Sequence, residues 1–146
     1  MEIRGEWYVC NDGVVRPILR GEVLAANGRW RGVEFLVDTG ADRTVFTASL
    51  FAVLGLEPTQ ADVELNGFGG TALAGVVRTR IRLTDTLGRK IDFRGEFAAA
   101  GDAAILDIAV LGRDVTNLFA LITDRQGDLI CLLRGNDRYQ IVRGSS

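Results

Sequence analysis

The chain of 146 residues contains no histidine and has only two cysteines, two prolines and one methionine. The absence of histidine excludes Ser–His and Cys–His catalysis and any imidazole metal site. The cysteines, Cys10 and Cys131, lie far apart and form no Cys-x-x-Cys motif. We interpret them as two separate, buried thiols in a reducing compartment, and a single disulfide between them stays open as the alternative.

A strong net charge and long apolar runs are also missing. The 17 basic and 19 acidic residues leave a net charge of −2, so binding to nucleic acid or an anionic membrane is not expected. Arg78, Arg80 and Arg82 alternate along one face of a predicted strand, which we expect to be solvated. No apolar run approaches the roughly 20 residues of a membrane helix. The charged N-terminus has no signal-peptide core, and the expected location is therefore cytoplasmic.

Strand-like segments separated by turns make up most of the chain, which we interpret as a single domain over residues 1–146. Residues 48–54 are either a short helix stopped by Gly55 or a loop that covers the core. A second short helix is expected over 115–120 with Asp114 as its N-cap. The predicted strands are 6–10, 14–19, 22–26, 30–37, 63–65, 71–77, 78–84, 91–98, 104–111, 121–124, 129–133 and 139–142. This pattern indicates a mainly β closed barrel or sandwich.

The most informative stretch, residues 35–46, reads Phe-Leu-Val-Asp-Thr-Gly-Ala-Asp-Arg-Thr-Val-Phe. A short apolar strand runs directly into Asp38, and Gly40 lets the backbone pass close to another group. The end of a buried strand is a costly place for a charge, and such carboxylates are more often functional than not. Taken without its surroundings, Asp-Thr-Gly is usually an Asx-turn between strands.

This stretch resembles the active-site loop of the retropepsin-like aspartic proteases, in which apolar residues precede Asp-Thr/Ser-Gly-Ala. Residues 110–114, Val-Leu-Gly-Arg-Asp, resemble the Gly-Arg-Asn/Asp segment that precedes a short helix in that family. Between the two lies the glycine-rich stretch 66–71, where the family has a mobile hairpin. The resemblance covers roughly residues 17–122, leaving 1–16 and 123–146 as extensions. It implies the mainly β, acid-protease half-barrel with one or two short helices.

The resemblance also implies an aspartic endopeptidase with Asp38 as its catalytic residue, no metal and no cofactor. Peptide hydrolysis needs one group to take a proton from water and another to protonate the carbonyl oxygen. Two carboxylates that share a proton do both, and aspartic proteases are the standard example of this arrangement. One Asp-Thr-Gly per chain implies a homodimer with one Asp38 from each subunit on the two-fold axis. The first candidate for the interface is the segment 129–142.

Further roles follow from the resemblance. Thr39 is expected to hydrogen-bond across the dimer axis, and Gly40 to offer its backbone to a peptide substrate, with Ala41 beside it. A lid over the peptide is expected at the glycine-rich tip, for which an ordinary surface turn is the alternative. The residues of this tip are Gly67, Phe68, Gly69 and Gly70.

Asp42 is expected to contact the substrate backbone and to form an ion pair with Arg113. We interpret Arg113 as structural, tying the Asp loop to the start of a helix without touching substrate. Arg43 either lines the cleft, where it would favour an acidic substrate side chain, or points into solvent.

Two rival functions remain at this point. One is a peptide-binding or assembly module that keeps the fold without catalysis, and a strictly monomeric chain would favour it. The other is a protease that acts only within its own precursor or on one regulatory partner. A nucleotide site is not expected, because the glycine-rich stretch lacks the strand-to-helix context, and an EF-hand would need a closing glutamate.

Overall fold

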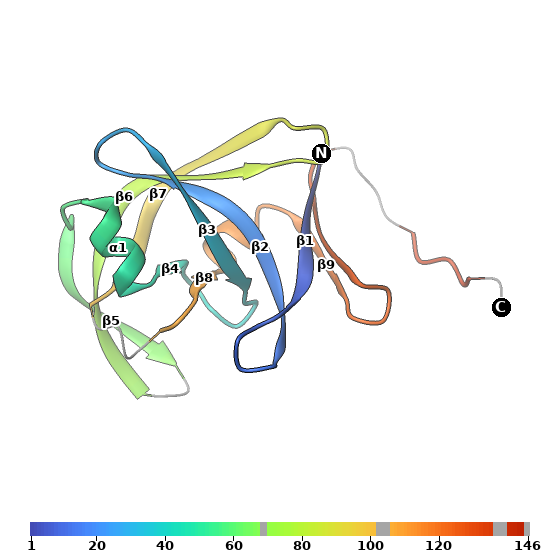
Figure 1. The fold of residues 1–146 in the computed structure, drawn as a ribbon, viewed down its shortest axis with the longest axis horizontal. Helices are drawn as coiled ribbons and strands as arrows, with labels where there is room; N and C mark the ends of the chain where they lie inside the picture. Colours follow the sequence, from blue (N-terminus) through green and yellow to red (C-terminus); the bar gives the residue numbers. More distant parts are fainter. Residues whose placement is uncertain (68–69, 102–105, 136–139, 145–146) are drawn as a thin grey trace.

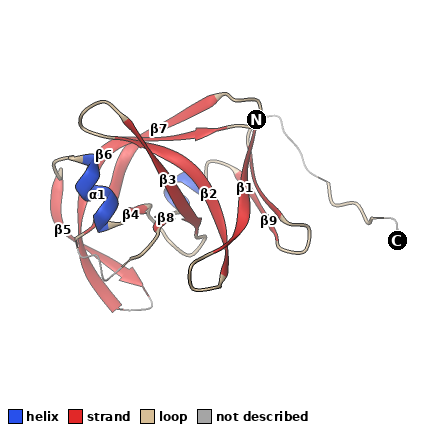
Figure 2. Ribbon diagram, in the orientation of Figure 1, coloured by secondary structure: helices blue, strands red, loops and turns tan. Residues whose placement is uncertain are grey.

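The computed structural model describes residues 1–67, 70–101, 106–135 and 140–144. Most of the chain is built from β-strands joined as hairpins (Figure 2). The first five strands are β1 (Glu2–Val9), β2 (Val15–Leu24), β3 (Trp30–Val37), β4 (Val45–Phe46) and β5 (Gln60–Gly67). The others are β6 (Gly70–Thr84), β7 (Lys90–Ala100), β8 (Ala109–Leu111), β9 (Ala120–Asp124) and β10 (Leu129–Leu133). The helices are α1 (Ala48–Leu54) and α2 (Arg113–Thr116).

Six of the strands close into a barrel. They follow one another in the order β6-β7-β4-β8-β3-β2, and β2 then pairs with β6 through Glu22↔Arg82 and Val23↔Ile81. Closure removes free edges within this ring, which is how antiparallel sheets commonly avoid unpaired backbone. The structure therefore confirms the expected mainly β closed barrel with short helices.

The interior of the barrel is filled by aliphatic and aromatic side chains. Phe35 and Phe46 are fully buried, and the ring of Phe46 lies 5.7 Å from that of Phe97. Ile81 and Leu83 are also fully buried, on the face of β6 opposite its arginines. Each such side chain contributes about 1.5–3 kcal/mol through its removal from water. This core fixes the strand ends on which the polar loops are carried.

A second group of strands extends the sheet beyond the barrel. β1 pairs with β2 through Glu6–Val9 and with β10 through its first residues, and β10 in turn pairs with β9. A glycine is required at position 5, where β1 passes from pairing with β10 to pairing with β2. A Cβ there would lie 2.5 Å from the Ile18 carbonyl oxygen and 2.9 Å from the side chain of Ile130. The two chain segments beyond the resemblance thus pack together, with β9 at the side of the molecule (Figure 1).

The segment 48–54 is a helix, which settles the alternative left by the sequence. Thr47 caps α1 by accepting a hydrogen bond from the Leu50 amide at 3.1 Å. Gly55 ends it with a φ of 64°, a left-handed conformation that glycine adopts without strain. No helix in the described parts of the chain has the length and apolar character needed to cross a membrane.

Several expected elements differ from those observed. The two strands predicted over 71–77 and 78–84 form one strand, β6, because no turn residue interrupts them. The strand predicted over 104–111 is limited to β8; residues 106–108 form no strand, and 104–105 lie outside the described residues. Residues 140–142 are not a strand either, because they leave the domain and pair with nothing described. Tyr139 lies outside the described residues.

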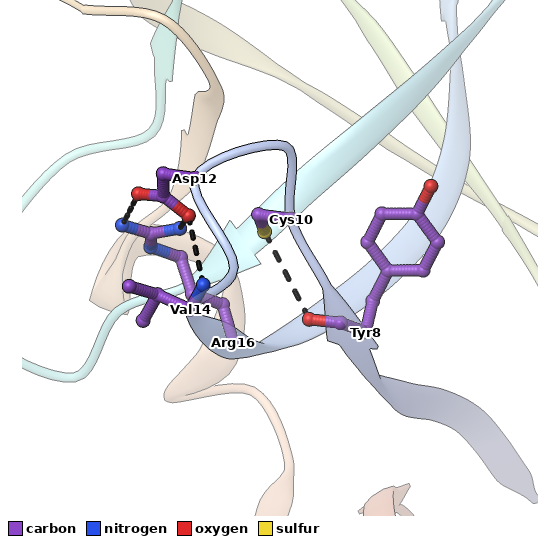
Figure 3. Close-up of polar contacts among 5 residues, drawn as sticks. All are labelled: Tyr8, Cys10, Asp12, Val14 and Arg16. Carbon is purple, nitrogen blue, oxygen red and sulfur yellow. Dashed lines mark hydrogen bonds and ion pairs between the residues drawn. The ribbon is translucent and has the colours of Figure 1, made fainter.

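The turn between β1 and β2 is held by Asp12 (Figure 3). Its Oδ1 accepts from the Val14 amide at 3.0 Å, and its two oxygens accept from Arg16 at 2.8 and 2.7 Å. The hydrogen bond from Arg16 lowers the pKa of Asp12 to about 2. Cys10 in the same turn is a free thiol whose Sγ lies 3.8 Å from the Tyr8 carbonyl oxygen. It is half-buried, whereas the sequence analysis expected a buried thiol.

The turn between β6 and β7 depends on a buried carboxylate. Asp85 is 5% exposed, and its Oδ1 accepts from the amides of Leu87 at 2.9 Å and Arg89 at 2.8 Å, while Oδ2 binds Arg89 Nε at 2.7 Å. Burial alone would raise the pKa of Asp85, but these contacts together outweigh it and lower the pKa below the ordinary 3.8. The charged form is therefore favoured by the folded state.

We predict that Asp85→Asn lowers the melting temperature at neutral pH, because the amide keeps an acceptor but loses the ion pair. A depressed pKa stabilises the fold above the unfolded value of 3.8, and this stabilisation is lost as pH falls through the folded pKa. The difference between variant and parent should therefore shrink as pH falls below about 3.8. Melting curves across pH test this, with exposed Asp107→Asn as the control; a difference that persists unchanged in acid would contradict it.

Candidate active site

The Asp loop begins where the barrel brings two distant strands together. β3 and β8 run parallel with Phe35↔Ala109 and Val37↔Leu111 in register. The Asp38 amide continues this pairing by donating to the Leu111 carbonyl oxygen at 3.2 Å. The Asp-Thr-Gly and Gly-Arg-Asp segments therefore leave the same edge of the barrel, side by side.

Asp38 itself is half-buried and is oriented by its own loop. Its Oδ1 accepts from the Gly40 amide at 2.9 Å, and the Ala41 amide lies 3.3 Å from the Asp38 carbonyl oxygen. No hydrogen bond to Oδ2 is formed by the residues that the structure describes. Thr39 and Gly40 are both exposed. One carboxylate oxygen is thus held in place while the other is available to an external group.

Arg113 fastens the loop from the side of α2. Its amide donates to the Ala41 carbonyl oxygen at 2.8 Å, and Nη1 donates to the Thr39 carbonyl oxygen at 2.9 Å. Nη2 forms an ion pair with Asp42 Oδ1. The structure thus brings together Asp42 and Arg113, as the sequence suggested, and adds two backbone contacts to the pair.

The Asp42–Arg113 ion pair is more exposed than its expected role implied. The side chains are 78% and 42% exposed, respectively. Exposed pairs are worth only about 0–1 kcal/mol, because water screens them. The contacts of Arg113 with main-chain oxygens are therefore its main structural contribution.

Arg43 is half-buried and forms no hydrogen bond or ion pair among the described residues.

Thr44 and Asp114 form a second link that the sequence analysis missed. Thr44 is fully buried; its amide and hydroxyl donate to the two oxygens of Asp114 at 2.9 and 2.7 Å. Its hydroxyl also accepts from the Gly112 amide at 3.1 Å. The predicted N-cap role of Asp114 was wrong: Gly112 is the N-cap of α2 and no side chain caps the helix. A threonine immediately before the apolar pair 45–46 was the available signal.

Gly112 allows the two segments to touch through their backbones. A Cβ on this residue would lie 2.3 Å from the Arg43 carbonyl carbon, 2.5 Å from its oxygen and 2.8 Å from the Thr44 amide nitrogen. These are backbone atoms of a hydrogen-bonded loop, so they cannot move aside cheaply. The glycine of Gly-Arg-Asp is therefore dictated by this contact.

β5 and β6, on either side of the glycine-rich tip, pair antiparallel, and Gly67 lies opposite Gly70. Phe68 and Gly69, both expected in the lid, lie outside the described residues.

A hollow of about 710 Å³ lies elsewhere, between the β1–β2 turn, the first half of β3, α1 and residues 106–109. Its walls include none of the residues 38–43. Within the described chain, no three acidic or cysteine side chains gather as metal ligands would. The chemistry available around Asp38 is therefore that of a carboxylate in a hydrogen-bonded loop.

Comparisons with known proteins match this geometry. The family described as aspartyl protease matches residues 22–136. A retropepsin-like aspartic protease from Rickettsia conorii superimposes with a TM-score of 0.56 and 22% identity, covering 90% of each chain. EIAV protease complexed with the inhibitor HBY-793 gives a TM-score of 0.46 and 24% identity, covering 70% of this chain and 86% of its own. A search of curated proteins gives no match. The barrel is thus a retropepsin-like fold.

We predict that Gly112→Ala destabilises the protein by about 1–3 kcal/mol, the usual cost of overpacking, because the added methyl group meets backbone atoms. The matched control is Gly32→Ala in β3, where a Cβ would meet nothing within 4 Å. Denaturant unfolding of both variants measures the difference. Equal stability of the two variants would show that the loops do not meet as described.

Proposed function

The chain belongs to the aspartyl protease family, and on this basis we propose that it is an aspartic endopeptidase that works as a homodimer. The observation that carries the proposal is Asp38, which is held by its own loop at Oδ1 and has an Oδ2 available to an external group. Each chain supplies one Asp38, so two chains are required for a pair of carboxylates.

In the proposed reaction the two Asp38 side chains share one proton, because two adjacent negative charges cannot both persist. The ionised carboxylate takes a proton from water as its oxygen attacks the peptide carbonyl carbon, and the protonated one gives its proton to the carbonyl oxygen. Collapse of the tetrahedral intermediate breaks the C–N bond as the protonated carboxyl gives its proton to the leaving nitrogen and the ionised one takes a proton from a hydroxyl group of the intermediate. The pair then again holds one proton.

The remaining loop residues support this arrangement in the proposal. Arg113 fixes the main chain at Thr39 and Ala41, so the loop does not need to reorganise when substrate binds. Exposed Gly40 and Asp42 offer backbone and carboxylate to an extended peptide, beside Arg43. The β5–β6 hairpin acts as the lid.

In the proposed dimer the second chain joins through β9 rather than through the segment 129–142 as a whole. Both edges of β10 are paired, with β1 on one side and β9 on the other, so β10 has no edge to offer. The outer edge of β9 pairs with no strand in the described parts of the chain, which makes it a ready partner for a second copy. The side chains of Ile141 and Val142, in the tail that leaves the domain (Figure 1), are 94% and 73% exposed. A second chain packed against them would remove their apolar surface from water.

We predict that Asp38→Asn reduces kcat on peptide substrates by on the order of 10³-fold or more, because an amide cannot exchange the shared proton. The fold should persist, since the asparagine oxygen can still accept from the Gly40 amide. Peptide hydrolysis and melting curves for the parent, Asp38→Asn and the control Asp107→Asn measure this. Retained hydrolysis in Asp38→Asn would remove Asp38 from the mechanism.

We predict one site for every two chains. A peptide-like inhibitor with a hydroxyl group in place of the scissile carbonyl should bind with a stoichiometry of one per dimer and raise the melting temperature, because it binds only the assembled state. Calorimetric titration alongside sedimentation measures both quantities. One inhibitor per chain, or activity from a species that remains monomeric, would overturn the shared site.

A further inference from the structure

Three arginines of β6 lie on the outer face of the barrel, each opposite a charged residue of β7. The register of the two strands forms three rows: Arg78↔Glu96, Arg80↔Arg94 and Arg82↔Asp92. The first and third rows pair opposite charges, whereas the middle row places two like charges directly across from each other.

The outer rows are neutralised by ion pairs. Arg78 Nη2 lies 2.7 Å from Glu96 Oε1, and Arg82 donates to both oxygens of Asp92 at 2.7 and 2.9 Å. Arg82 also stacks on Trp30 with its guanidinium carbon 3.8 Å from the ring centroid. These charges are therefore already engaged.

The middle row has no ion pair of this kind among the described residues. Neither Arg80 nor Arg94 forms an ion pair or a side-chain hydrogen bond with any residue that the structure describes. Like charges directly opposite on a sheet are destabilising. The pKa of Asp92 is lowered mainly by its hydrogen bonds from Arg82 and further by the nearby charge of Arg80. Both carboxylate oxygens of Asp92 are nevertheless bound by Arg82. The middle row therefore carries two cations with unused donors.

A hollow of about 290 Å³ opens beside these two side chains. Its other walls are Leu24, Ala25, Leu56, Arg78 and Thr79. The Thr79 hydroxyl is already used, donating to the Leu24 carbonyl oxygen at 2.7 Å. The polar side chains of the lining that have no partner among the described residues are thus those of Arg80 and Arg94, and Leu24, Ala25 and Leu56 are aliphatic.

We propose that this hollow binds a carboxylate carried on an apolar stem. Arg80 and Arg94 donate to the carboxylate oxygens, as guanidinium groups commonly do, and Leu24 and Leu56 contact the stem. The volume lies at the lower limit for ligand pockets, so it accepts a single group rather than a length of peptide. A free organic acid and the acidic side chain of a protein both have this chemistry.

The site is separate from Asp38. Leu24 pairs with Trp30 at the turn of the β2–β3 hairpin, whereas Leu36 pairs with Ile18 near the catalytic loop. Six residues of strand between these two positions correspond to about 20 Å. Occupancy of the hollow therefore does not compete with a peptide at Asp38, and the inference stands independently of the proposed reaction.

The test uses Arg94→Glu, which turns the middle row into an Arg–Glu pair like its neighbours. The control is Arg31→Glu, the same charge change at an exposed residue of β3 that has no ion pair among the described residues. Melting temperatures of the parent and both variants are measured with sodium hexanoate, the peptide acetyl-Leu-Glu-Leu-amide, or inorganic phosphate, with sodium chloride used to equalise ionic strength.

We expect Arg94→Glu to melt higher than the parent without ligand and to bind the carboxylates at least about tenfold more weakly, as loss of a guanidinium-to-carboxylate contact predicts. The parent and Arg31→Glu should be stabilised alike. A response to hexanoate but not to the peptide identifies a free acid, the reverse identifies a protein side chain, and a response to both fits either source. No response in the parent, an equal response in Arg94→Glu, or a response only to phosphate would overturn the proposal.

Discussion

The contact between the Asp loop and the Gly-Arg-Asp segment is the constraint on which the rest of the site depends. It consists of the hydrogen bonds between Thr44 and Asp114, which are 70 residues apart in sequence, and of the close backbone approach at Gly112. The contact is carried by the barrel, in which β3 and β8 pair in parallel directly before the two segments. Asp38 is consequently presented by a loop whose position is fixed from two sides.

Under the proposed mechanism, one chain supplies only half of the site. A single carboxylate cannot both accept a proton from water and supply one to the carbonyl oxygen. The sheet that carries β1 and β10 ends at β9, whose outer edge pairs with no strand in the described chain. In the proposed homodimer, a second copy of the chain would supply the second carboxylate, and the outer edge of β9 is where we propose that it joins.

The sequence predicted the parts of this structure that local patterns control. Apolar segments separated by turns predicted most of the strands, and the apolar strand before Asp38 predicted the position of the loop. Contacts between distant segments could not be predicted in this way. Asp114 was predicted to be a helix cap, because nothing in its local sequence shows that the buried Thr44 donates hydrogen bonds to both of its carboxylate oxygens. The exposure of the Asp42–Arg113 pair and the pairing of both β10 edges likewise depend on tertiary packing.

The most direct test of the shared site is an activity measurement on mixed dimers. Parent and Asp38→Asn chains are unfolded together, refolded at constant total concentration and assayed as the parent fraction is varied. If both carboxylates are needed, activity follows the square of the parent fraction, so an equal mixture retains about one quarter of the parent activity. A linear decrease, with about one half retained, would show that each chain acts alone and would contradict the account.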